Sequence, residues 1–326
     1  MAGQDIVAEK LERSFGGDVV VDRVDLAVPA GDVFACVGPP GAGRTPLIRM
    51  LCGLLAPSGG KAKVAGFDIS SQTAEVRTRV GAVLSGNSLD PRSSGREALR
   101  FLGRLYGMNG SLLESRVAAA LELAGVTDID NAAIATHELP VRRRLELAAA
   151  LIHGPQVLFL DEATSGLDKT DAAALLTDVR DIQRTLGMTV FFATQATTEA
   201  DQIADRVAIM DHGRIVAEGD LSELKASVGG ELIACRIEGP AEHAGRVAKT
   251  VSGVQDVVVN GQEVALLTTG GGAVLTPLAA AFSANGVVAL EMSFRRATLD
   301  DVFVELTGVH LEGMGGRATM AFPAQK

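Results

Sequence analysis

Residues 33–46, VFACVGPPGAGRTP, decide the fold of this chain. Residues 33–37 form a continuous apolar run, which is typical of a strand buried in a parallel sheet. Gly38 to Thr45 then match the phosphate-binding pattern G-x-x-x-x-G-K-[ST], except that Arg44 stands in place of lysine. The pattern lies between a strand and a stretch that we expect to be helical to about Leu55. In that setting backbone N–H groups point at phosphate oxygens. We therefore predict a nucleotide phosphate site here.

Two substitutions are expected to weaken this phosphate loop. Arg44 keeps the positive charge, but its planar fork is bulkier than an ammonium group and is not equivalent to it. Pro46 suits the first helical turn but removes a backbone N–H donor. Thr45 keeps the hydroxyl that such sites use for Mg²⁺. The candidate nucleotide-binding residues of the loop are Gly38, Pro39, Pro40, Gly41, Ala42, Gly43, Arg44, Thr45 and Pro46.

A second apolar strand, residues 157–160, ends in two carboxylates. Asp161 at the strand tip would hold Mg²⁺ through water, and Glu162 would polarise an attacking water. An Asp-Glu pair alone also fits a solvated loop. Behind a phosphate loop it indicates a metal and water site. The loop that follows contains Ser165, Gly166, Leu167 and Asp168.

These loops resemble the Walker A, Walker B and D-loop of ABC ATPases, and the resemblance runs over residues 5–220. The run RATLDDVFVELTG, residues 296–308, resembles the end of ATP-binding subunits of the daunorubicin-resistance type, which pair with small membrane permeases in bacterial drug exporters. The resemblance implies ATP and Mg²⁺ as cofactors, a permease partner, and a second ATP-binding subunit with two ATPs between the two domains. It also identifies Phe15 with the aromatic residue on which these proteins stack adenine, although a core Phe is the alternative.

Four loops depart from the family pattern. Ser85 stands where the family has a glutamine that reaches the metal and the water, and we expect serine to be too short for that gap, so its place as a metal ligand is doubtful. Gln195 stands at the switch position, where the family has a catalytic histidine, and it is a weakened switch because it cannot carry a proton or a positive charge. Ala163 replaces a proline after the acidic pair. The Ser-Gly-Gly core of the signature loop is replaced by Glu138, Leu139, Pro140 and Val141.

The signature-loop residues are unsuited to clasp a phosphate. Glu138 brings negative charge, Leu139 adds bulk, and Pro140 removes a donor, where the family presents a hydroxyl and backbone N–H groups to the partner's ATP. Residues 142–144, three arginines, are expected to be a solvated helix face rather than a nucleic-acid patch.

The fold class that follows is α/β, a P-loop ABC ATPase domain with a parallel sheet core, N-terminal antiparallel strands and a helical subdomain. We place this domain at residues 1–222 and its helical subdomain at about 95–151. A small α+β domain of β-α-β-β-α-β pattern is expected at 223–310, with Asn260-Gly261 as a hairpin turn. Residues 311–326 are expected to be a disordered tail. Short strands are expected near the N-terminus at 6–11, 19–21 and 24–28.

Composition limits the partners and the location. The formal charge is −10 and there is no Trp, so no nucleic-acid partner is expected. The most apolar stretch, residues 273–290, is interrupted by Pro277, Ser283, Asn285 and Gly286 and is not expected to span a membrane. Three cysteines without metal spacing are expected to be buried thiols. A cytoplasmic protein, peripheral on the inner face of the plasma membrane through a permease, is predicted.

The sequence favours an exporter ATP-binding subunit, for a drug or small hydrophobic compound, with weak or lost hydrolysis. Two alternatives stay open: a non-hydrolysing structural or regulatory partner, and a fully active ATPase despite the substitutions. A homodimer and a heterodimer are both open. A dinucleotide-binding oxidoreductase is excluded because Gly38–Gly43 lacks the G-x-G-x-x-G spacing.

Overall fold

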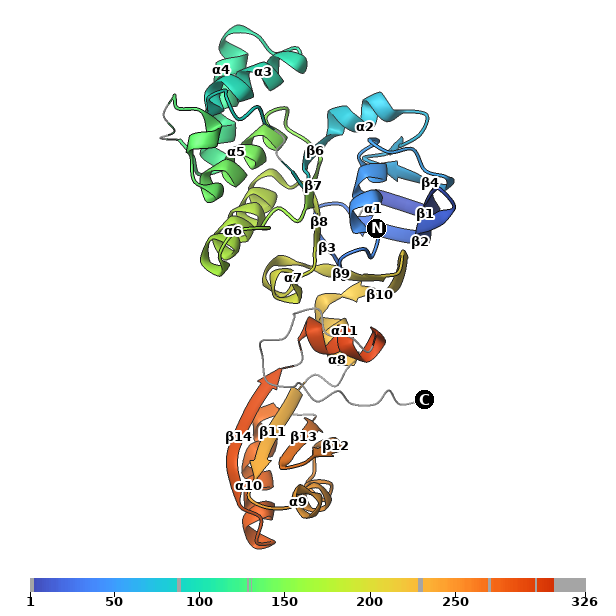
Figure 1. Cartoon of the computed structure of the whole chain (residues 1–326), viewed down its shortest axis with the longest axis vertical. Coiled ribbons are helices and arrows are strands. Elements are labelled where there is room, and N and C mark those ends of the chain that lie inside the picture. The colour runs from blue at the N-terminus through green and yellow to red at the C-terminus, as the bar shows by residue number, and fades with distance from the viewer. Residues whose placement is uncertain are drawn as a thin grey trace. The chain divides into compact units, whose positions relative to one another are not determined.

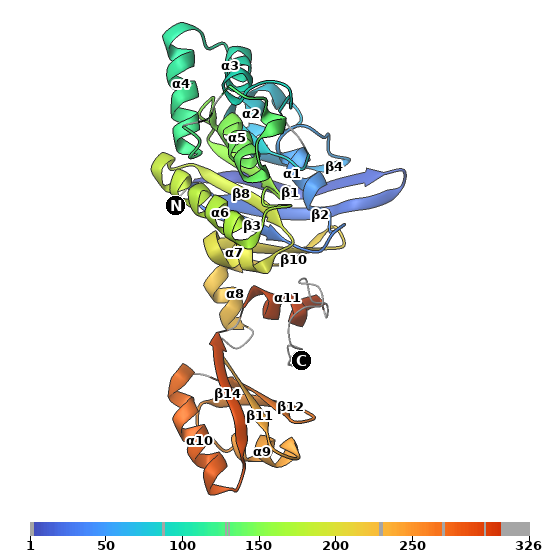
Figure 2. The ribbon, with the colours of Figure 1, turned by 60° about the vertical axis from the view of Figure 1, so that its left-hand side comes forward.

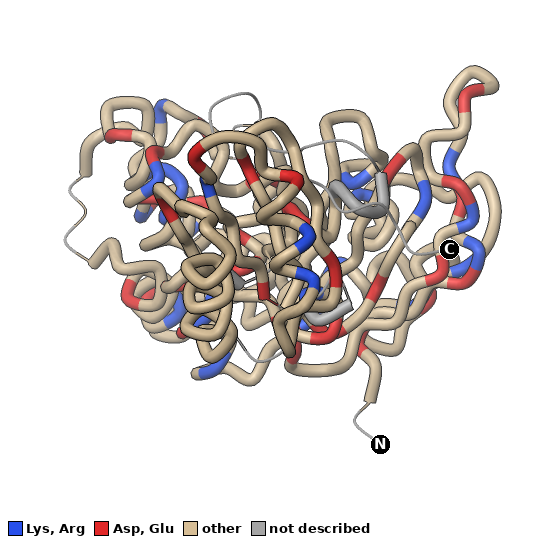
Figure 3. The backbone as a smooth tube through the Cα atoms, turned by 90° about the horizontal axis from the view of Figure 1, so that it is seen from below, with Lys and Arg blue, Asp and Glu red and all other residues tan. Residues whose placement is uncertain are grey.

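The structure, a computed structural model, describes residues 3–86, 89–127, 129, 131–227, 231–268, 271–296 and 298–307 (Figure 1). The chain divides into two compact units, Met1–Glu218 and Gly219–Lys326. The expected tail from residue 311 lies outside the described residues. Lys and Arg positions are interspersed with Asp and Glu positions along the chain (Figure 3).

The centre of the first unit is a six-stranded sheet within the described residues, in the order β10-β9-β3-β8-β7-β6. β3 lies parallel to β8 and β9, and β7 lies parallel to β6 and β8. β3 and β7 are buried along their whole length, as their apolar runs predict. The strands are β3 (Val33–Val37), β6 (Val80–Val83), β7 (Val157–Asp161), β8 (Thr189–Thr194), β9 (Arg206–Asp211) and β10 (Arg214–Asp220).

A second sheet in this unit has the order β2-β1-β4-β5, with each pair antiparallel. The expectation of separate strands at 19–21 and 24–28 is wrong, because one long strand covers both. Bulged positions explain this: Lys10 and Arg23 have φ near +48° and +49°, and the register shifts between Ala8 and Leu11, so the hairpin bends without ending. The strands are β1 (Gln4–Phe15), β2 (Asp18–Pro29), β4 (Gly59–Val64) and β5 (Phe67–Asp68).

Helix α1 (Arg44–Leu51) lies in the core that the two sheets share. Its Leu47 and Ile48 pack in one cluster with Leu11 of β1 and Phe159 of β7. The helix stops at residue 51, four residues before the expected end near Leu55, because the chain turns through Gly53 at φ +67°. The phosphate loop is thus anchored to a helix that is buried on two sides.

A helical region stands to one side of the sheets and has its own core, with α3 and α4 packed side by side (Figures 1 and 2). Leu99, Leu121 and Leu145 are fully buried in it. The helices of the first unit other than α1 are α2 (Thr73–Arg79), α3 (Gly95–Leu105), α4 (Gly110–Leu123), the 3₁₀ turn η1 (Ile134–Thr136), α5 (Leu139–Leu151), α6 (Lys169–Leu186) and α7 (Thr197–Ile203).

The second unit is built on an antiparallel sheet in the order β12-β13-β11-β14, whose buried side packs against α9 and α10. The elements follow one another in the β-α-β-β-α-β order of the sequence pattern. The hairpin turn lies one residue later than expected, because Asn260 pairs with Glu263 and leaves Gly261 and Gln262 in the loop. The elements are α8 (Leu221–Ser227), β11 (Glu231–Ile237), α9 (Ala241–Ala248), β12 (Val254–Asn260), β13 (Glu263–Thr268), η2 (Gly271–Val274), α10 (Leu275–Ala284), β14 (Ala289–Arg296) and α11 (Leu299–Thr307).

Among the described residues, no helix combines the length and the apolar character needed to cross a membrane. The three cysteines are buried free thiols, as expected. Burial raises the pKa of Cys36, just before the phosphate loop, to about 12, so its thiol is neutral at physiological pH.

Candidate functional site

Four loops leave the parallel sheet at the same edge. The phosphate loop follows β3, Ser85 lies beyond the end of β6, Glu162 follows β7, and Gln195 follows β8. Parallel strands present their carboxyl ends together, and such edges are where ligands bind in α/β proteins. The topology therefore gathers the residues that the sequence singles out.

The phosphate loop packs closely against neighbouring backbone at Gly38 and Gly43 and is open at Gly41. A Cβ at Gly38 would lie 2.2 Å from the Met210 carbonyl oxygen, and one at Gly43, which has φ +102°, would lie 2.3 Å from the Val20 carbonyl oxygen. The Gly213 N–H, from the turn between β9 and β10, donates to the Ala42 carbonyl at 2.9 Å. At Gly41, with φ +83°, a Cβ would meet no heavy atom within 4 Å. Only glycine allows both the close packing and the left-handed turns that shape this loop.

Arg44 is the buried cation of the loop, only 6% exposed. Its Nη2 donates to Oε1 of Glu162 at 2.9 Å, forming an ion pair. Its Nη1 is buried and has no hydrogen-bond partner among the residues that the structure describes. A buried guanidinium N–H without an acceptor is costly, and a phosphate oxygen is the acceptor that suits it. The residues therefore fit a nucleotide phosphate.

The Asp161 carboxylate accepts hydrogen bonds from two hydroxyl groups. Thr45 Oγ1 donates to its Oδ1 at 3.0 Å, and Ser85 Oγ donates to its Oδ2 at 3.1 Å. Asp161 is 1% exposed. No group of three or more His, Cys, Asp or Glu side chains that could hold a metal occurs among the described residues. A hard cation here would therefore depend on the Asp161 carboxylate and the hydroxyls, with further oxygens from its ligand. Ser85 reaches the carboxylate directly, although it is shorter than glutamine.

Glu162 sits in an unusual backbone conformation for a residue with a side chain, at φ +51°. Its N–H donates to the Ala193 carbonyl of β8 at 3.0 Å, which fixes the start of the loop. Left-handed residues other than glycine cluster at functional sites, where the surrounding structure holds them.

A carboxylate that the sequence did not single out joins two of these loops. Glu199 of α7 accepts hydrogen bonds from Thr164, behind Glu162, and from Thr194, before Gln195, each at 2.6 Å. Both threonine side chains are buried. The sequence shows only that Glu199 lies in the first turn of the helix after Gln195, where acidic residues are common. That position does not predict its hydrogen bonds to Thr164 and Thr194.

The signature-loop residues lie at the start of α5, beside the D-loop of the same chain. Glu138 is exposed and occupies the N-cap position, with Pro140 at the second helical residue. Leu139 packs against the D-loop, its Cδ2 3.0 Å from a Cβ built at Gly166. The D-loop ends at Asp168, whose side chain caps α6 by accepting from the Asp171 N–H at 2.8 Å.

The prediction of a solvated arginine face on α5 is wrong, because none of the three arginines at 142–144 is exposed. Arg143 pairs with Glu146 at 2.9 Å and donates to the Ser165 carbonyl at 3.1 Å. Arg144 pairs with Asp178 of α6. The side chains of Arg143 and Arg144 therefore hold α5 to the D-loop and to α6 of the same chain.

Phe15, the candidate adenine platform, lies at the end of β1 and is 45% exposed. The guanidinium carbon of Arg13 lies 4.3 Å from its ring centroid, an arrangement that sequence analysis missed. Arg13 is itself held by a 2.8 Å hydrogen bond to the Ala56 carbonyl. One ring face therefore stacks on a cation. Gln195, the candidate switch residue, is exposed.

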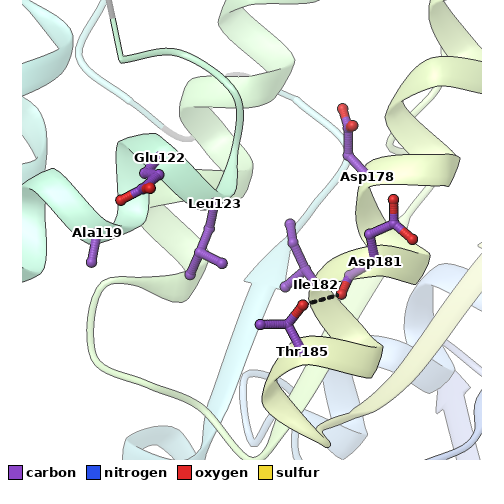
Figure 4. Close-up of a pocket in the computed structure, with 7 residues that line it drawn as sticks. All are labelled: Ala119, Glu122, Leu123, Asp178, Asp181, Ile182 and Thr185. Atoms are coloured by element: carbon purple, nitrogen blue, oxygen red, sulfur yellow. Dashed lines mark hydrogen bonds between the residues drawn. The ribbon is translucent and has the colours of Figure 1, made fainter.

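A separate hollow of about 430 Å³ lies between α4 and α6 (Figure 4). Apolar side chains and carboxylates both line it, and none of the candidate site residues does. The lining residues are Ala119, Glu122, Leu123, Asp178, Asp181, Ile182 and Thr185.

Known proteins are similar in sequence to most of this chain. The ABC transporter family model matches residues 21–165. The daunorubicin resistance ATP-binding protein DrrA3 of Streptomyces coeruleorubidus is 36% identical over 313 residues, 94% of this chain and 97% of that protein. The daunorubicin/doxorubicin resistance ATP-binding protein DrrA of Streptomyces peucetius is 41% identical over 230 residues, 70% of this chain and 68% of that protein.

Solved structures share the fold. CbiO1 from Clostridium perfringens, part of the ABC transporter complex cbiONQ, has a TM-score of 0.63 and 24% identity, covering 68% of this chain and 91% of that chain. An ATP-binding cassette solved as a dimer in a post-hydrolysis state with ADP and phosphate has a TM-score of 0.60 and 18% identity, covering 66% of this chain and 98% of that chain. The predicted fold class is confirmed.

Proposed function

This chain belongs to the ABC transporter family, among ATP-binding proteins of the daunorubicin-resistance type, and from that premise we propose that it is the ATP-binding subunit of a bacterial exporter that turns over ATP slowly or not at all. The observation that carries the proposal is how the two terminal nitrogens of the Arg44 guanidinium are placed. Its guanidinium offers a buried Nη1 to a phosphate while its Nη2 is bound to Glu162, the candidate base.

Mg-ATP would be held by backbone N–H groups of the loop from Gly41 onward, by Arg44 at the phosphate, and by Thr45 with Asp161 at the metal, since the Gly38 N–H already donates to Thr194. Bound Mg²⁺ would supply positive charge next to the phosphates. Arg44 supplies a further charge from a site that water scarcely reaches. Pro46, at the third helical residue of α1, supplies no N–H, so the loop binds more weakly than an intact one.

Slow hydrolysis is supported by the positions of the candidate base and the switch residue. The ion pair with Arg44 engages Oε1 of Glu162, so that oxygen is not free to polarise a water until the pair opens. Gln195 can donate a hydrogen bond to phosphate but cannot carry a proton. The ion pair also favours the second candidate, a non-hydrolysing regulatory partner, since it engages the base in a structural contact.

A permease partner is supported by exposed apolar side chains on the helical region. Phe101 and Leu105 of α3 are 62% and 68% exposed, and Leu112 of α4 is 55% exposed. Apolar side chains gathered on neighbouring helices are typical of protein–protein contacts. Docking there would bring the chain to the inner face of the plasma membrane. The relatives named for daunorubicin and doxorubicin resistance support a drug or small hydrophobic compound as the exported substrate.

A second ATP-binding subunit would have to meet the signature loop. Glu138 is exposed at the N-cap of α5, the helix end that the family turns toward the partner's phosphate. A carboxylate at this position repels phosphate. A functional dimer would therefore need a different subunit to supply a competent ATP site.

The test measures Mg-ATP affinity and phosphate release on one purified sample. Binding in the micromolar range with turnover far below one per second would support the slow subunit. Binding without any turnover would favour the regulatory partner. Brisk turnover by the chain alone would refute both, and no binding at millimolar ATP would refute an ATP-binding role.

A further inference from the structure

Glu199 connects two loops that come from different strands. Its Oε2 accepts from the Thr194 hydroxyl at the end of β8, and its Oε1 accepts from the Thr164 hydroxyl in the loop after β7. Both distances are 2.6 Å, and the two threonines are 3% and 8% exposed. Short hydrogen bonds to a carboxylate are the strong kind, and here water scarcely reaches the donors.

Thr194 is also tied to the phosphate loop and to the switch turn. Its carbonyl accepts from the Gly38 N–H at 3.3 Å, and its hydroxyl oxygen accepts from the Ala196 N–H at 3.0 Å. The backbone on both sides of Gln195 is therefore fixed by one threonine. Whatever displaces Gly38 or Gln195 acts on Thr194 and hence on Glu199.

Thr164 is tied equally closely to the loop of the candidate base. The Leu167 N–H donates to its carbonyl at 3.0 Å, and the Ser165 N–H donates to the Glu162 carbonyl at 2.9 Å. These bonds close the turn that begins at Glu162, so the turn moves as one piece with Thr164.

We propose that Glu199 is a positioning residue that joins the loop of Glu162 to the loop of Gln195, so that phosphate bound in the Gly38 loop orders both together. The inference rests on the proposed nucleotide binding. A carboxylate is required because it accepts at both oxygens, whereas an amide offers one acceptor oxygen and a donor group. Asp is one methylene shorter and cannot span the same pair of hydroxyls from the same backbone position.

A purely structural role for Glu199, fixing α7 to the sheet, is the alternative. Such a role would lower the unfolding temperature when Glu199 is removed but would leave the response to nucleotide intact. The chain contains a matched control in Glu97, which also lies in the first turn of a helix and accepts from the Ser94 hydroxyl at 2.8 Å, in the capping box of α3. Glu97→Ala therefore removes a comparable bond from outside the site.

The experiment is hydrogen–deuterium exchange of the full chain with and without Mg-ATP, with thermal unfolding measured on each variant. In the wild type we expect Mg-ATP to slow exchange at residues 38–46, 162–167 and 195–199. In Glu199→Ala the slowing at 38–46 and at 195–199 stays, because Thr194 keeps its own bond to Gly38, and the slowing at 162–167 is lost. Glu97→Ala behaves as the wild type in exchange, even where its unfolding temperature falls.

A second pair of variants keeps the test valid if Glu199→Ala does not fold. Thr164→Val removes one hydroxyl at nearly constant volume, and Thr164→Ser keeps it. We expect Val to uncouple the two loops and Ser to keep them coupled. Slowing at 162–167 in Glu199→Ala or Thr164→Val equal to that of the wild type would overturn the inference alone. A wild type without slowing at 38–46 would overturn the proposed nucleotide binding, and the inference with it.

Discussion

The ion pair between Arg44 and Glu162 should oppose nucleotide binding, so Glu162→Gln is expected to tighten the binding of Mg-ADP. Arg44 bonds to Glu162 at 2.9 Å and is only 6% exposed, so its Nη2 turns to a phosphate only when this bond opens. The substitution keeps the shape of the side chain and removes its charge. ADP is the ligand of choice because ATP could add a contribution from dimer formation.

The size of the effect follows from the pair itself. A hydrogen bond to a charged group contributes about 1.5–3 kcal/mol net. Glu162 is 30% exposed and its amide replacement still accepts a hydrogen bond, so the lower end of that range applies. About 1.4 kcal/mol corresponds to a tenfold gain in affinity. Glu162→Gln should therefore bind Mg-ADP roughly tenfold more tightly than the wild type.

The assay is calorimetric titration of Mg-ADP into wild type, Glu162→Gln and Glu75→Gln at 0.15 M salt. Glu75 is an exposed carboxylate on α2, and its substitution matches the change in net charge. It should leave the affinity unchanged. Equal affinities in all three proteins would refute the claim that Glu162 competes with phosphate for Arg44. A gain of the same size in Glu75→Gln would assign the effect to net charge.

Three further outcomes are expected. Arg44→Lys alone should leave phosphate release slow, whereas Arg44→Lys with Ser85→Gln and Gln195→His should raise it, because such residues act as a unit; equal release by the single and triple variants would contradict this. Burial lowers the pKa of His153 below its ordinary value of 6.5, against a hydrogen bond to a backbone carbonyl that raises it. Its contribution to stability is therefore complete above pH 6.5 and falls as the pH drops below that value, where the unfolded chain binds the proton first. Urea unfolding of the wild type should show this loss, and His153→Gln should show less of it; parallel pH curves would exclude His153 as the cause. Finally, Glu162→Gln on its own should stay monomeric by light scattering with and without Mg-ATP, because the signature loop opposes phosphate, and an ATP-dependent shift to a dimer would contradict that reasoning.

The main sheet and the place of the site could be predicted because both depend on local patterns. Apolar runs such as Val33–Val37 and Val157–Leu160 become buried parallel strands, and the glycine spacing after Val37 requires a turn that only glycine can make. The long strand β2 was missed because its bulge at Arg23 depends on pairing with β1.

Side-chain partners from distant segments could not be predicted. Arg44 and Glu162 lie 118 positions apart, and Thr164 and Glu199 lie 35 apart, so neither pair has a spacing that a sequence pattern would reveal. Three consecutive arginines predict a solvated face, because composition does not show that Arg143 and Arg144 have carboxylate partners at Glu146 and Asp178. Tertiary packing decides such contacts, and propensity does not.

The contact between Arg44 and Glu162 also constrains how this sequence can change over generations. Removing the carboxylate that pairs with a buried guanidinium destabilises a protein by up to about 3–5 kcal/mol, and by less where the carboxylate is 30% exposed, as Glu162 is. Even the lower values are a large share of the roughly 5–15 kcal/mol by which folded proteins are more stable than their unfolded forms. Asp161 likewise anchors two hydroxyls, and Asp168 caps α6. Replacing Glu162, Asp161 or Asp168 would therefore reduce the amount of folded protein even in a lineage in which hydrolysis was no longer selected. Such a lineage would retain all three acids long after hydrolysis had been lost.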